Sequence, residues 1–407
     1  MSPEEFRSLF PALSAEVYGK PLVYLDNAAT SQRPKSVVEK WTDLTYRCNA
    51  NLHRAVHYLA DKATGEYEGA RECVKNFINA RNASEIVFTS GATMSLNLVA
   101  FSFGQKFVGE GDEVFVTESE HHSNIVPWQL MCRRQGAVLK YIPVDESGHL
   151  DLEFLKKNIT CRTRIVCVTH ISNVLGLTNP IKEIVSICHS AGCKVLTDGA
   201  QGLVHCPVDV QELDCDFYVF SGHKMYAAPS TGVLYGKAEI LNQLPPFLSG
   251  GEMIDSVKWS GTTFAPVPAR FEAGTQNLAG VPTFGPAIET LLAGRSEAIE
   301  REQKKIVEYL YDTLSREPGV RLYGTTDNLE EKIPLFSISV EGVHHEDLAL
   351  ILDKMGIAVR SGQMCAEPLM DRFGVTGMLR ASFAPYNTFE EAEKFIVSLR
   401  KAVKMLR

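Results

Sequence analysis

Alternation of short β-rich runs with helical patterns is the feature that most limits the fold of this chain. From about residue 85 onward, apolar runs of strand length are separated by amphipathic stretches such as Ile181–Ala191, which ends before Gly192. Strands that alternate with helices predict a mostly parallel sheet with helices on both faces, the α/β class. Candidate site residues are then expected at the carboxyl ends of the strands. The predicted strands are Glu85–Thr89, Glu113–Thr117, Arg164–Thr169, Lys194–Asp198, Phe217–Phe220 and Gly232–Tyr235.

A turn-rich region, Leu244–Pro282, interrupts this alternation and is followed by a long helical pattern from about Ile288 to Glu317. The remaining chain predicts a smaller α+β unit. We therefore expect an N-terminal arm (residues 1–20) that packs on the small domain, a large domain (21–284) and a small C-terminal domain (285–407) with a polar loop around Cys365. The elements predicted in the last part are Leu335–Val340, Glu346–Met355, Ile357–Val359, Pro368–Phe373, Gly377–Ala381 and Phe389–Leu406.

Composition excludes several classes of protein. The chain has 407 residues, a net charge of -8 and 45% hydrophobic residues, which is ordinary for a globular protein. It has no basic stripe for nucleic acid and no apolar run of about 18 residues for a membrane span. Glu4 and Glu5 are unlike a signal peptide, so a cytoplasmic location is expected. The ten cysteines form no CxxC pair and are expected to be free thiols, most of them buried.

Residues Lys194–Lys224 hold a dense group of polar side chains at strand ends. The strand KVLTD ends at Asp198, Gln201 follows three residues later, and the next strand leads into Ser221-Gly222-His223-Lys224. A carboxylate and a lysine at neighbouring strand ends suit pyridoxal phosphate, which needs an amine for a Schiff base and an anion beside its ring nitrogen. Taken singly, an aspartate at a strand end is more often a helix cap, and most lysines are solvated side chains.

This segment resembles the core of the class V, fold-type I pyridoxal-phosphate enzymes, and the similarity covers nearly the whole chain. The motifs together are more similar to the SUF-type cysteine desulfurases and selenocysteine lyases than to aminotransferases in general. They are YLDNAAT (Tyr24–Thr30), NLHRAVH (Asn51–His57), SGATMSLNLVA (Ser90–Ala100), EHHSNIVPW (Glu120–Trp128), RFEAGTQN (Arg270–Asn277, near a dimer interface in the family) and RASFAPYNT (Arg380–Thr388).

The resemblance implies how pyridoxal 5'-phosphate would be held in the large domain. Lys224 would form the Schiff base, Asp198 would pair with the pyridinium nitrogen and Gln201 would bond the phenolic oxygen. His121 would stack on the ring and move protons. The phosphate would lie at backbone amides of a helix start. The side chains implied to hold it are Thr93, Ser221 and His223, with Thr275 reaching over from the partner subunit of a homodimer.

His121 and His122 could alternatively form a paired metal site. Adjacent histidines point apart in most backbones, and no third ligand is spaced nearby in the sequence. Ring stacking by His121 is therefore favoured, and no metal is expected.

The substrate chemistry rests on an arginine and a cysteine in the small domain. An arginine fork can hold a carboxylate, and by the resemblance Arg380 would bind the α-carboxylate of L-cysteine with help from Asn173. Cys365 lies in the loop RSGQMCAEPLM, where an exposed thiolate would attack sulfur. The implied reaction releases alanine and leaves a persulfide on Cys365. A SUF-type acceptor protein would then take the sulfur for iron–sulfur cluster assembly.

The chain departs from the family pattern near Cys365 and in the turn that would bind the phosphate. Gln363 and Met364 stand where many relatives have two histidines before the loop cysteine, and Ala92 stands where relatives tend to carry a second threonine. Glu367 brings a negative charge near Cys365, which disfavours the thiolate and predicts slower unassisted persulfide formation.

Three other functions are alternatives to a cysteine desulfurase. A selenocysteine lyase or another β-eliminating enzyme would use Lys224, Asp198 and Arg380 but depend less on Cys365. A non-catalytic sulfur carrier or assembly scaffold is disfavoured, because these residues and His121 are all present. A nicotinamide dehydrogenase is disfavoured because no G-x-G-x-x-G follows the first strand.

Overall fold

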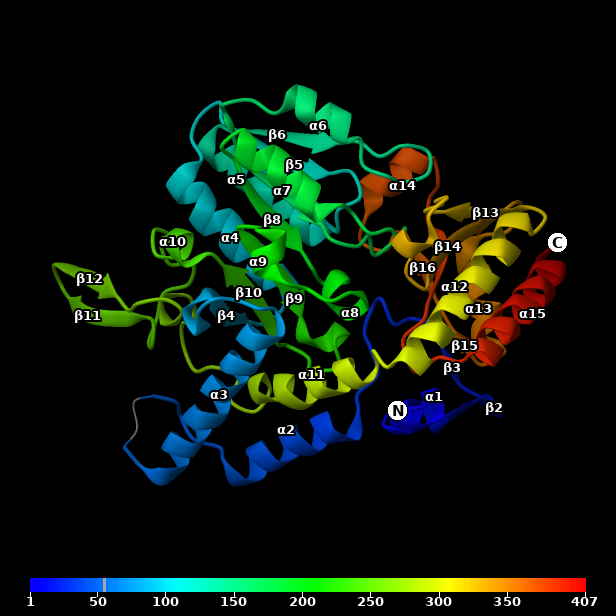
Figure 1. The fold of residues 1–407 in the computed structure, drawn as a ribbon, viewed down its shortest axis with the longest axis horizontal. Helices are drawn as coiled ribbons and strands as arrows, with labels where there is room; N and C mark the ends of the chain where they lie inside the picture. Colours follow the sequence, from blue (N-terminus) through cyan, green and yellow to red (C-terminus); the bar gives the residue numbers. More distant parts are fainter. Residues whose placement is uncertain (54–55) are drawn as a thin grey trace.

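The computed structural model describes residues 1–53 and 56–407, which are built around a large and a small sheet (Figure 1). The large sheet has seven strands in the order β4-β10-β9-β8-β7-β5-β6. Its neighbours are parallel except β10, which runs antiparallel to β4 and β9. The α/β class predicted from the sequence is confirmed. The strands are β4 (Ile86–Thr89), β5 (Glu113–Thr117), β6 (Val138–Ile142), β7 (Thr163–Thr169), β8 (Lys194–Asp198), β9 (Phe217–Ser221) and β10 (Gly232–Gly236).

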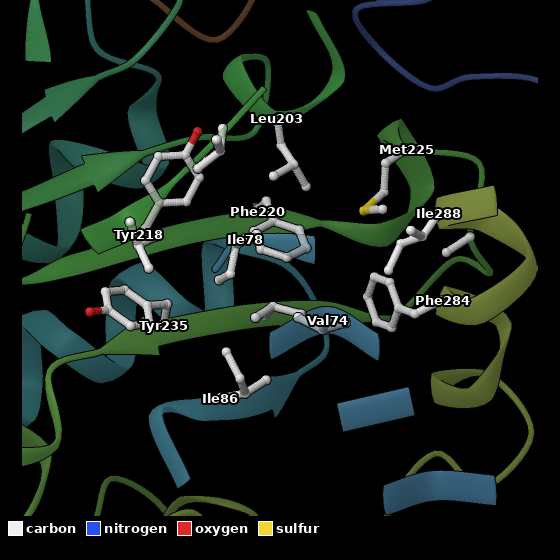
Figure 2. Packing of buried hydrophobic residues seen from close by; sticks show 14 of the residues in the cluster. Val74, Ile78, Ile86, Leu203, Tyr218, Phe220, Met225, Tyr235, Phe284 and Ile288 are labelled. Carbon is white, nitrogen blue, oxygen red and sulfur yellow. The ribbon is translucent and has the colours of Figure 1, made fainter. Parts of the chain in front are cut away.

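Helices cover both faces of the large sheet, because its central strands are apolar on both sides. Along β9, Tyr218 and Phe220 belong to one buried cluster, while Phe217 and Val219 belong to another. Figure 2 shows the first cluster, in which the rings of Phe284 and Phe220 lie edge to face with centroids 6.3 Å apart. The helices around this sheet are α2 (Lys35–Arg47), α3 (Tyr58–Phe77), α4 (Ala92–Phe107), α5 (Val126–Gln135), α6 (Leu152–Asn158), α7 (Ile181–Ser190), α8 (Gly202–His205), α9 (Val210–Leu213), α10 (Ala238–Leu241) and α11 (Phe284–Ala293).

The small sheet is antiparallel, with the strand order β13-β14-β17-β16, and its apolar face packs on long helices. Its strands are β13 (Val320–Tyr323), β14 (Leu335–Val340), β16 (Arg360–Gly362) and β17 (Met378–Ser382). Its helices are α12 (Glu297–Arg316), α13 (His345–Lys354), α14 (Glu367–Phe373) and α15 (Phe389–Leu406). The remaining elements are α1 (Pro3–Ser8), β1 (Glu16–Val17), β2 (Lys20–Pro21), β3 (Val23–Tyr24), β11 (Ile254–Lys258), β12 (Gly261–Phe264) and β15 (Ile357–Ala358). Figure 1 shows the hairpin β11–β12 projecting on the side opposite the small sheet.

The prediction of a single helix from Ile288 to Glu317 is wrong. The structure has two helices here, because α11 ends at Ala293 and α12 begins at Glu297. A Cβ atom at Gly294 would lie 2.9 Å from the ring of Phe6, so the chain passes close to the N-terminal segment there. The next residue, Arg295, turns its guanidinium to the carbonyls of Leu203 and Cys206, at 2.9 and 2.8 Å. These tertiary contacts interrupt the helix, although the amphipathic pattern of the sequence continues through this point.

The N-terminal segment contacts side chains from both parts of the molecule. The ring of Phe10 lies 5.2 Å from that of Tyr226 and 4.6 Å from that of Tyr386. Arg7 forms an ion pair with Glu391 at 2.8 Å. The predicted divisions after residues 20 and 284 stay predictions. Among the described residues, no helix combines the length and apolar character that crossing a membrane requires.

Candidate active site

A cavity of about 530 Å³ lies at the carboxyl ends of β7, β8 and β9, where the loop after β16 closes over them. It brings together every predicted site residue except Thr275, which is exposed and does not line it. The predicted residues that line the cavity are Thr93, His121, Asn173, Asp198, Gln201, Ser221, His223, Lys224, Cys365 and Arg380.

Lys224 and Asp198 reach the cavity from neighbouring parallel strands. Asp198 is the last residue of β8, and a short turn after β9 carries Lys224. Burial lowers the pKa of Lys224 to about 8; nearby Asp198 raises it, and Arg380 lowers it further. Burial also raises the pKa of Asp198, although the Ala200 amide donates to its carboxylate at 2.9 Å. No carboxylate of the described residues lies within ion-pair distance of the Lys224 ammonium, which leaves this amine available.

The N-terminus of α4 forms one wall of the cavity. Its first intrahelical bond runs from the Ser95 amide to the Gly91 carbonyl at 3.1 Å, so the amides of Thr93 and Met94 have no intrahelical partner. Ser221 Oγ accepts the Ala92 amide at 2.8 Å. Free amides and the helix dipole at such an end favour an anion.

Two glycines allow this helix end to approach β10. Gly91 has a φ of 150°. A Cβ atom at Gly232 would lie 2.3 Å from the Cα atom of Gly91, closer than any side chain permits. The helix start therefore rests directly on the first residue of β10, beside Ser221 of the neighbouring strand β9.

Two histidines in the cavity are held in the neutral form. Burial lowers the pKa of His121 to about 4, with further lowering by Lys224, His122 and Arg380. Its Nδ1 accepts the Ser123 amide at 3.1 Å, so the ring proton is on Nε2. Burial also lowers the pKa of His223 to about 4, and its Nδ1 lies 3.2 Å from Thr30 Oγ1. A neutral His121 with a protonated Nε2 can donate a hydrogen bond or a proton.

Glu120 was not assigned a role from the sequence, although it belongs to the motif EHHSNIVPW. Its buried carboxylate accepts from Thr117 Oγ1 at 2.6 Å, Asn124 Nδ2 at 2.6 Å and the Thr169 amide at 2.7 Å. These bonds join the ends of β5 and β7 to the turn that carries His121. Burial raises the pKa of Glu120 to about 8. Nothing in the motif separates this buried anchor from a surface glutamate.

Arg380 is a buried residue of β17 whose guanidinium is held from two sides. Its Nη1 donates to the Asn173 carbonyl at 2.8 Å and its Nη2 to Asp26 Oδ1 at 3.2 Å. Its buried Nε has no hydrogen-bond partner among the described residues. Burial lowers its pKa to about 10, against the effect of Asp26. Arg360, which the sequence reasoning missed, lines the same cavity and pairs with Asp26 at 3.4 Å.

Gln201 and Asn173 use their amide groups on backbone carbonyls. Gln201 Nε2 donates to the Ala28 carbonyl at 2.8 Å. Asn173 Nδ2 donates to the Met364 carbonyl at 2.9 Å, so this residue contacts both Arg380 and the Cys365 loop. In the sequence, only the position of Asn173 after a predicted strand indicates that it could contact the Cys365 loop.

The Cys365 loop connects β16 to α14. Exposure alternates along it: Cys365 is exposed between the buried residues Met364 and Ala366. Met364 and Cys365 have φ values of 54° and 55°, which cost about 1 kcal/mol or more each for residues other than glycine. Gln363 Nε2 donates to Glu367 Oε1 at 3.1 Å. The predicted effect of Glu367 on persulfide formation stays a prediction.

The remaining predictions concern the cysteines as a set, the motif NLHRAVH and metal ligands. All ten cysteines are free; Cys167, Cys188 and Cys193 are buried as predicted, whereas Cys73 and Cys161 are exposed. Two residues of the motif NLHRAVH, at positions 54 and 55, lie outside the described residues. Elsewhere in the described chain, no three His, Cys, Asp or Glu side chains converge as metal ligands would.

The chain is similar to known proteins over nearly its whole length. Residues 23–395 match the aminotransferase class-V family. A protein of Vibrio cholerae named probable cysteine desulfurase is 44% identical over 403 residues, covering 99% of both chains. A protein of the same name from Halalkalibacterium halodurans is 46% identical over 401 residues, covering 98% of both.

Solved structures give the same result. The crystal structure of the cysteine desulfurase CsdA (S-sulfonic acid) from Escherichia coli has a TM-score of 0.91 and 39% identity, covering 100% of both chains. The apo structure of a cysteine desulfurase from Thermococcus onnurineus has a TM-score of 0.92 and 38% identity, covering 99% of this chain and 98% of that one. The chain therefore belongs to the class-V aminotransferase family, within the group whose members are named cysteine desulfurases.

Proposed function

We propose that this chain is a pyridoxal-phosphate-dependent cysteine desulfurase of the SUF type, which converts L-cysteine to L-alanine and takes the sulfur onto Cys365 as a persulfide. The observation that carries the proposal is that the exposed Cys365 lines the same cavity as Lys224, Asp198 and Arg380. The names of relatives that align with the whole chain support the same activity.

The residues of the cavity fit pyridoxal phosphate. Lys224 is an amine that forms no ion pair among the described residues, and Asp198 is a carboxylate whose pKa is raised by burial, although nearby Lys224 lowers it. The free amides of α4 suit a phosphate. When bound, this cofactor supplies an aldehyde for a Schiff base and a ring that stores an electron pair beside the substrate nitrogen. The side chains that would hold it are Thr93, His121, Asp198, Gln201, Ser221, His223 and Lys224, with Thr275 of a partner subunit.

Lys224 and His121 have protonation states that suit proton transfer. With a pKa of about 8, about one-tenth of Lys224 is neutral at pH 7, and only the neutral amine can react with an aldehyde or take a proton from the substrate. His121 is neutral and holds a proton on Nε2. We assign it the task of holding and returning protons during the reaction.

Arg380 and Cys365 act on the substrate itself. Arg380 lines the cavity and offers its guanidinium charge to the α-carboxylate, while Asn173 and Asp26 fix the guanidinium. The Cys365 thiolate forms an S–S bond with the sulfur of the substrate. The Cβ–S bond breaks, its electron pair stays on carbon, and a proton added there gives alanine. The thiolate thereby becomes a persulfide.

We further propose that the enzyme acts as a cytoplasmic homodimer and passes its sulfur to a SUF-type acceptor protein for iron–sulfur cluster assembly. Several large apolar side chains are almost fully exposed, including Tyr46, Val56, Tyr58 and Trp259. A second copy of the chain would cover such residues, and its Thr275 would complete the phosphate site. A persulfide is useful only when another protein accepts its sulfur.

Alanine formation by Cys365→Ala tests this function. We expect the variant to lose alanine formation from cysteine and to retain it with selenocysteine, whose selenium leaves carbon more readily. Cys161→Ala, which removes another exposed cysteine, should match the unaltered protein. Undiminished turnover of cysteine by Cys365→Ala would favour a β-eliminating enzyme, and no turnover of cysteine by the unaltered, cofactor-loaded protein would refute the desulfurase.

A further inference from the structure

His122 contacts the Cys365 loop at two points. Its main-chain amide donates to the Cys365 carbonyl at 2.7 Å, and its Nε2 accepts the Glu367 amide at 2.9 Å. Because Nε2 accepts this hydrogen bond, the ring N–H of His122 is on Nδ1. His121 and His122 both line the cavity, with ring centroids 6.4 Å apart, and His122 in addition holds the loop.

A third contact holds the same stretch of backbone. Asn173 Nδ2 donates to the Met364 carbonyl at 2.9 Å, and the Met364 side chain is buried in an apolar cluster. Main-chain groups of Met364, Cys365 and Glu367 are thus all bound by residues that follow strands of the large sheet. Together these contacts form a clamp, made of His122 and Asn173, on the loop.

The loop needs such a clamp because its own bonds are few. Within it, the Ala366 amide donates to the Gln363 carbonyl at 3.0 Å, and the Gln363 side chain reaches Glu367. Two successive residues with left-handed φ values, Met364 and Cys365, are unfavourable and persist only where surrounding structure imposes them.

We propose that His122 is a positioning residue for sulfur transfer, which together with Asn173 holds the Cys365 loop so that the thiol stays over the cavity. The inference rests on the proposed function in taking Cys365 as the sulfur acceptor. His122 itself does not touch the reacting atoms; it acts through the backbone on both sides of Cys365.

Two variants of the cofactor-loaded protein test the clamp. In His122→Gln the amide oxygen reaches about as far as Nε2 and can still accept the Glu367 amide. In His122→Asn the oxygen reaches only as far as Nδ1, so that bond is lost while a polar residue remains. His149→Asn is the matched control, because that imidazole contacts Glu331, at 3.3 Å, and not the loop.

The first readout is independent of catalysis: the alkylation rate of Cys365 by iodoacetamide without substrate, measured by peptide mass spectrometry. The exposed Cys73 and Cys161 serve as internal references. We expect His122→Asn to raise the Cys365 rate about fivefold relative to the references, as loss of one hydrogen bond implies. In alanine formation, kcat should fall by a similar factor while KM changes less than about twofold. His122→Gln should stay near the unaltered protein.

Three results would overturn the proposal: unchanged alkylation of Cys365 in His122→Asn, equal effects of Asn and Gln, or a rise shared by Cys73 and Cys161, which would show a general effect on the fold. If the unaltered protein forms no alanine, the proposed function fails, but the alkylation ratios still decide whether His122 holds the loop.

Discussion

At the scale of single residues, burial in one cavity gives neighbouring side chains different protonation states. Lys224, His121 and Arg380 all have pKa values lowered first by burial, to about 8, 4 and 10. The two cations also act on their neighbours, since Lys224 lowers the pKa of His121 and Arg380 lowers that of Lys224. Asp198 opposes the shift at Lys224. At neutral pH the cavity therefore holds a neutral imidazole, a partly neutral amine and a charged guanidinium.

This difference predicts the pH dependence of cofactor capture. The neutral amine of Lys224 reacts with the aldehyde, so capture of pyridoxal phosphate by the cofactor-free protein should quicken as pH rises and level off above about 8. In Asp198→Asn the carboxylate that raises the pKa of Lys224 is gone, and the midpoint should move to lower pH. Stopped-flow absorbance from pH 6 to about 10 measures both curves. A midpoint that moves upward, or not at all, would show that Asp198 does not raise the pKa of Lys224.

Residues at strand ends were predictable from the sequence, whereas residues defined by long-range contacts were not. Asp198 and Lys224 follow apolar strands, and parallel strands bring their carboxyl ends to one edge whatever else the chain does. Arg360 and Glu120 are ordinary charged residues in the sequence. Their places depend on Asp26 and on Thr169, which are distant along the chain.

At the scale of helices and strands, one segment of the chain has a structural task that its motif does not indicate. The motif RFEAGTQN is similar to a family segment near a dimer interface, and its Thr275 is exposed, but Glu272 within it is a buried anchor. Its carboxylate accepts both Nη atoms of Arg71, at 2.7 and 2.9 Å, and the Phe88 amide at 2.7 Å. It thus joins α3 and β4 to the segment after the hairpin.

Breaking this buried pair should be far more costly than breaking an exposed one on the same helix. Arg71→Leu leaves the Glu272 carboxylate buried without its partner, and we expect a loss of about 3–5 kcal/mol in the free energy of unfolding. Lys75→Ala, which removes the exposed pair with Glu72, should cost less than about 1 kcal/mol. Urea unfolding followed by circular dichroism measures both. Replacing Arg71 and Glu272 together by leucine should recover much of the loss, and a double variant as unstable as Arg71→Leu would contradict the explanation.

The active site depends, at the scale of the whole molecule, on how the two sheets are joined. Lys224 and Asp198 follow strands of the large sheet, while Arg380 belongs to the small one. Segment 174–178 pairs with segment 331–337 through the β-bridge between Leu177 and Lys332. A hydrogen bond from the Ile333 amide to the Gly176 carbonyl, at 3.0 Å, joins them as well. No local pattern predicts this junction, because its partners are about 150 residues apart and pair through backbone groups.

Lys332 is the centre of the junction and gives it a pH dependence. Its buried ammonium donates to the carbonyls of Leu175 and Gly324, and its pKa is lowered by burial to about 7. Between about pH 7 and the ordinary lysine value of about 10.4, the unfolded chain binds a proton that the folded chain lacks. The stability contributed at this residue should therefore rise with pH across that window, by at most about 1.4 kcal/mol per pH unit.

Lys332→Met removes this proton and should flatten the dependence. We expect the variant to lose the two hydrogen bonds at every pH. The free energy of unfolding of the variant should be closest to that of the unaltered protein near pH 7, where the buried charge is most costly. The variant should become steadily less stable than the unaltered protein towards pH 10. Urea unfolding at four or five pH values gives the difference curve, in which other titrating groups cancel. Lys305→Met, at an exposed position, should give a flat difference. A flat difference for Lys332→Met as well would mean that the ammonium keeps its proton in the folded protein, held by the two carbonyls and the ring of Phe336, 5.4 Å away, more firmly than burial disfavours it.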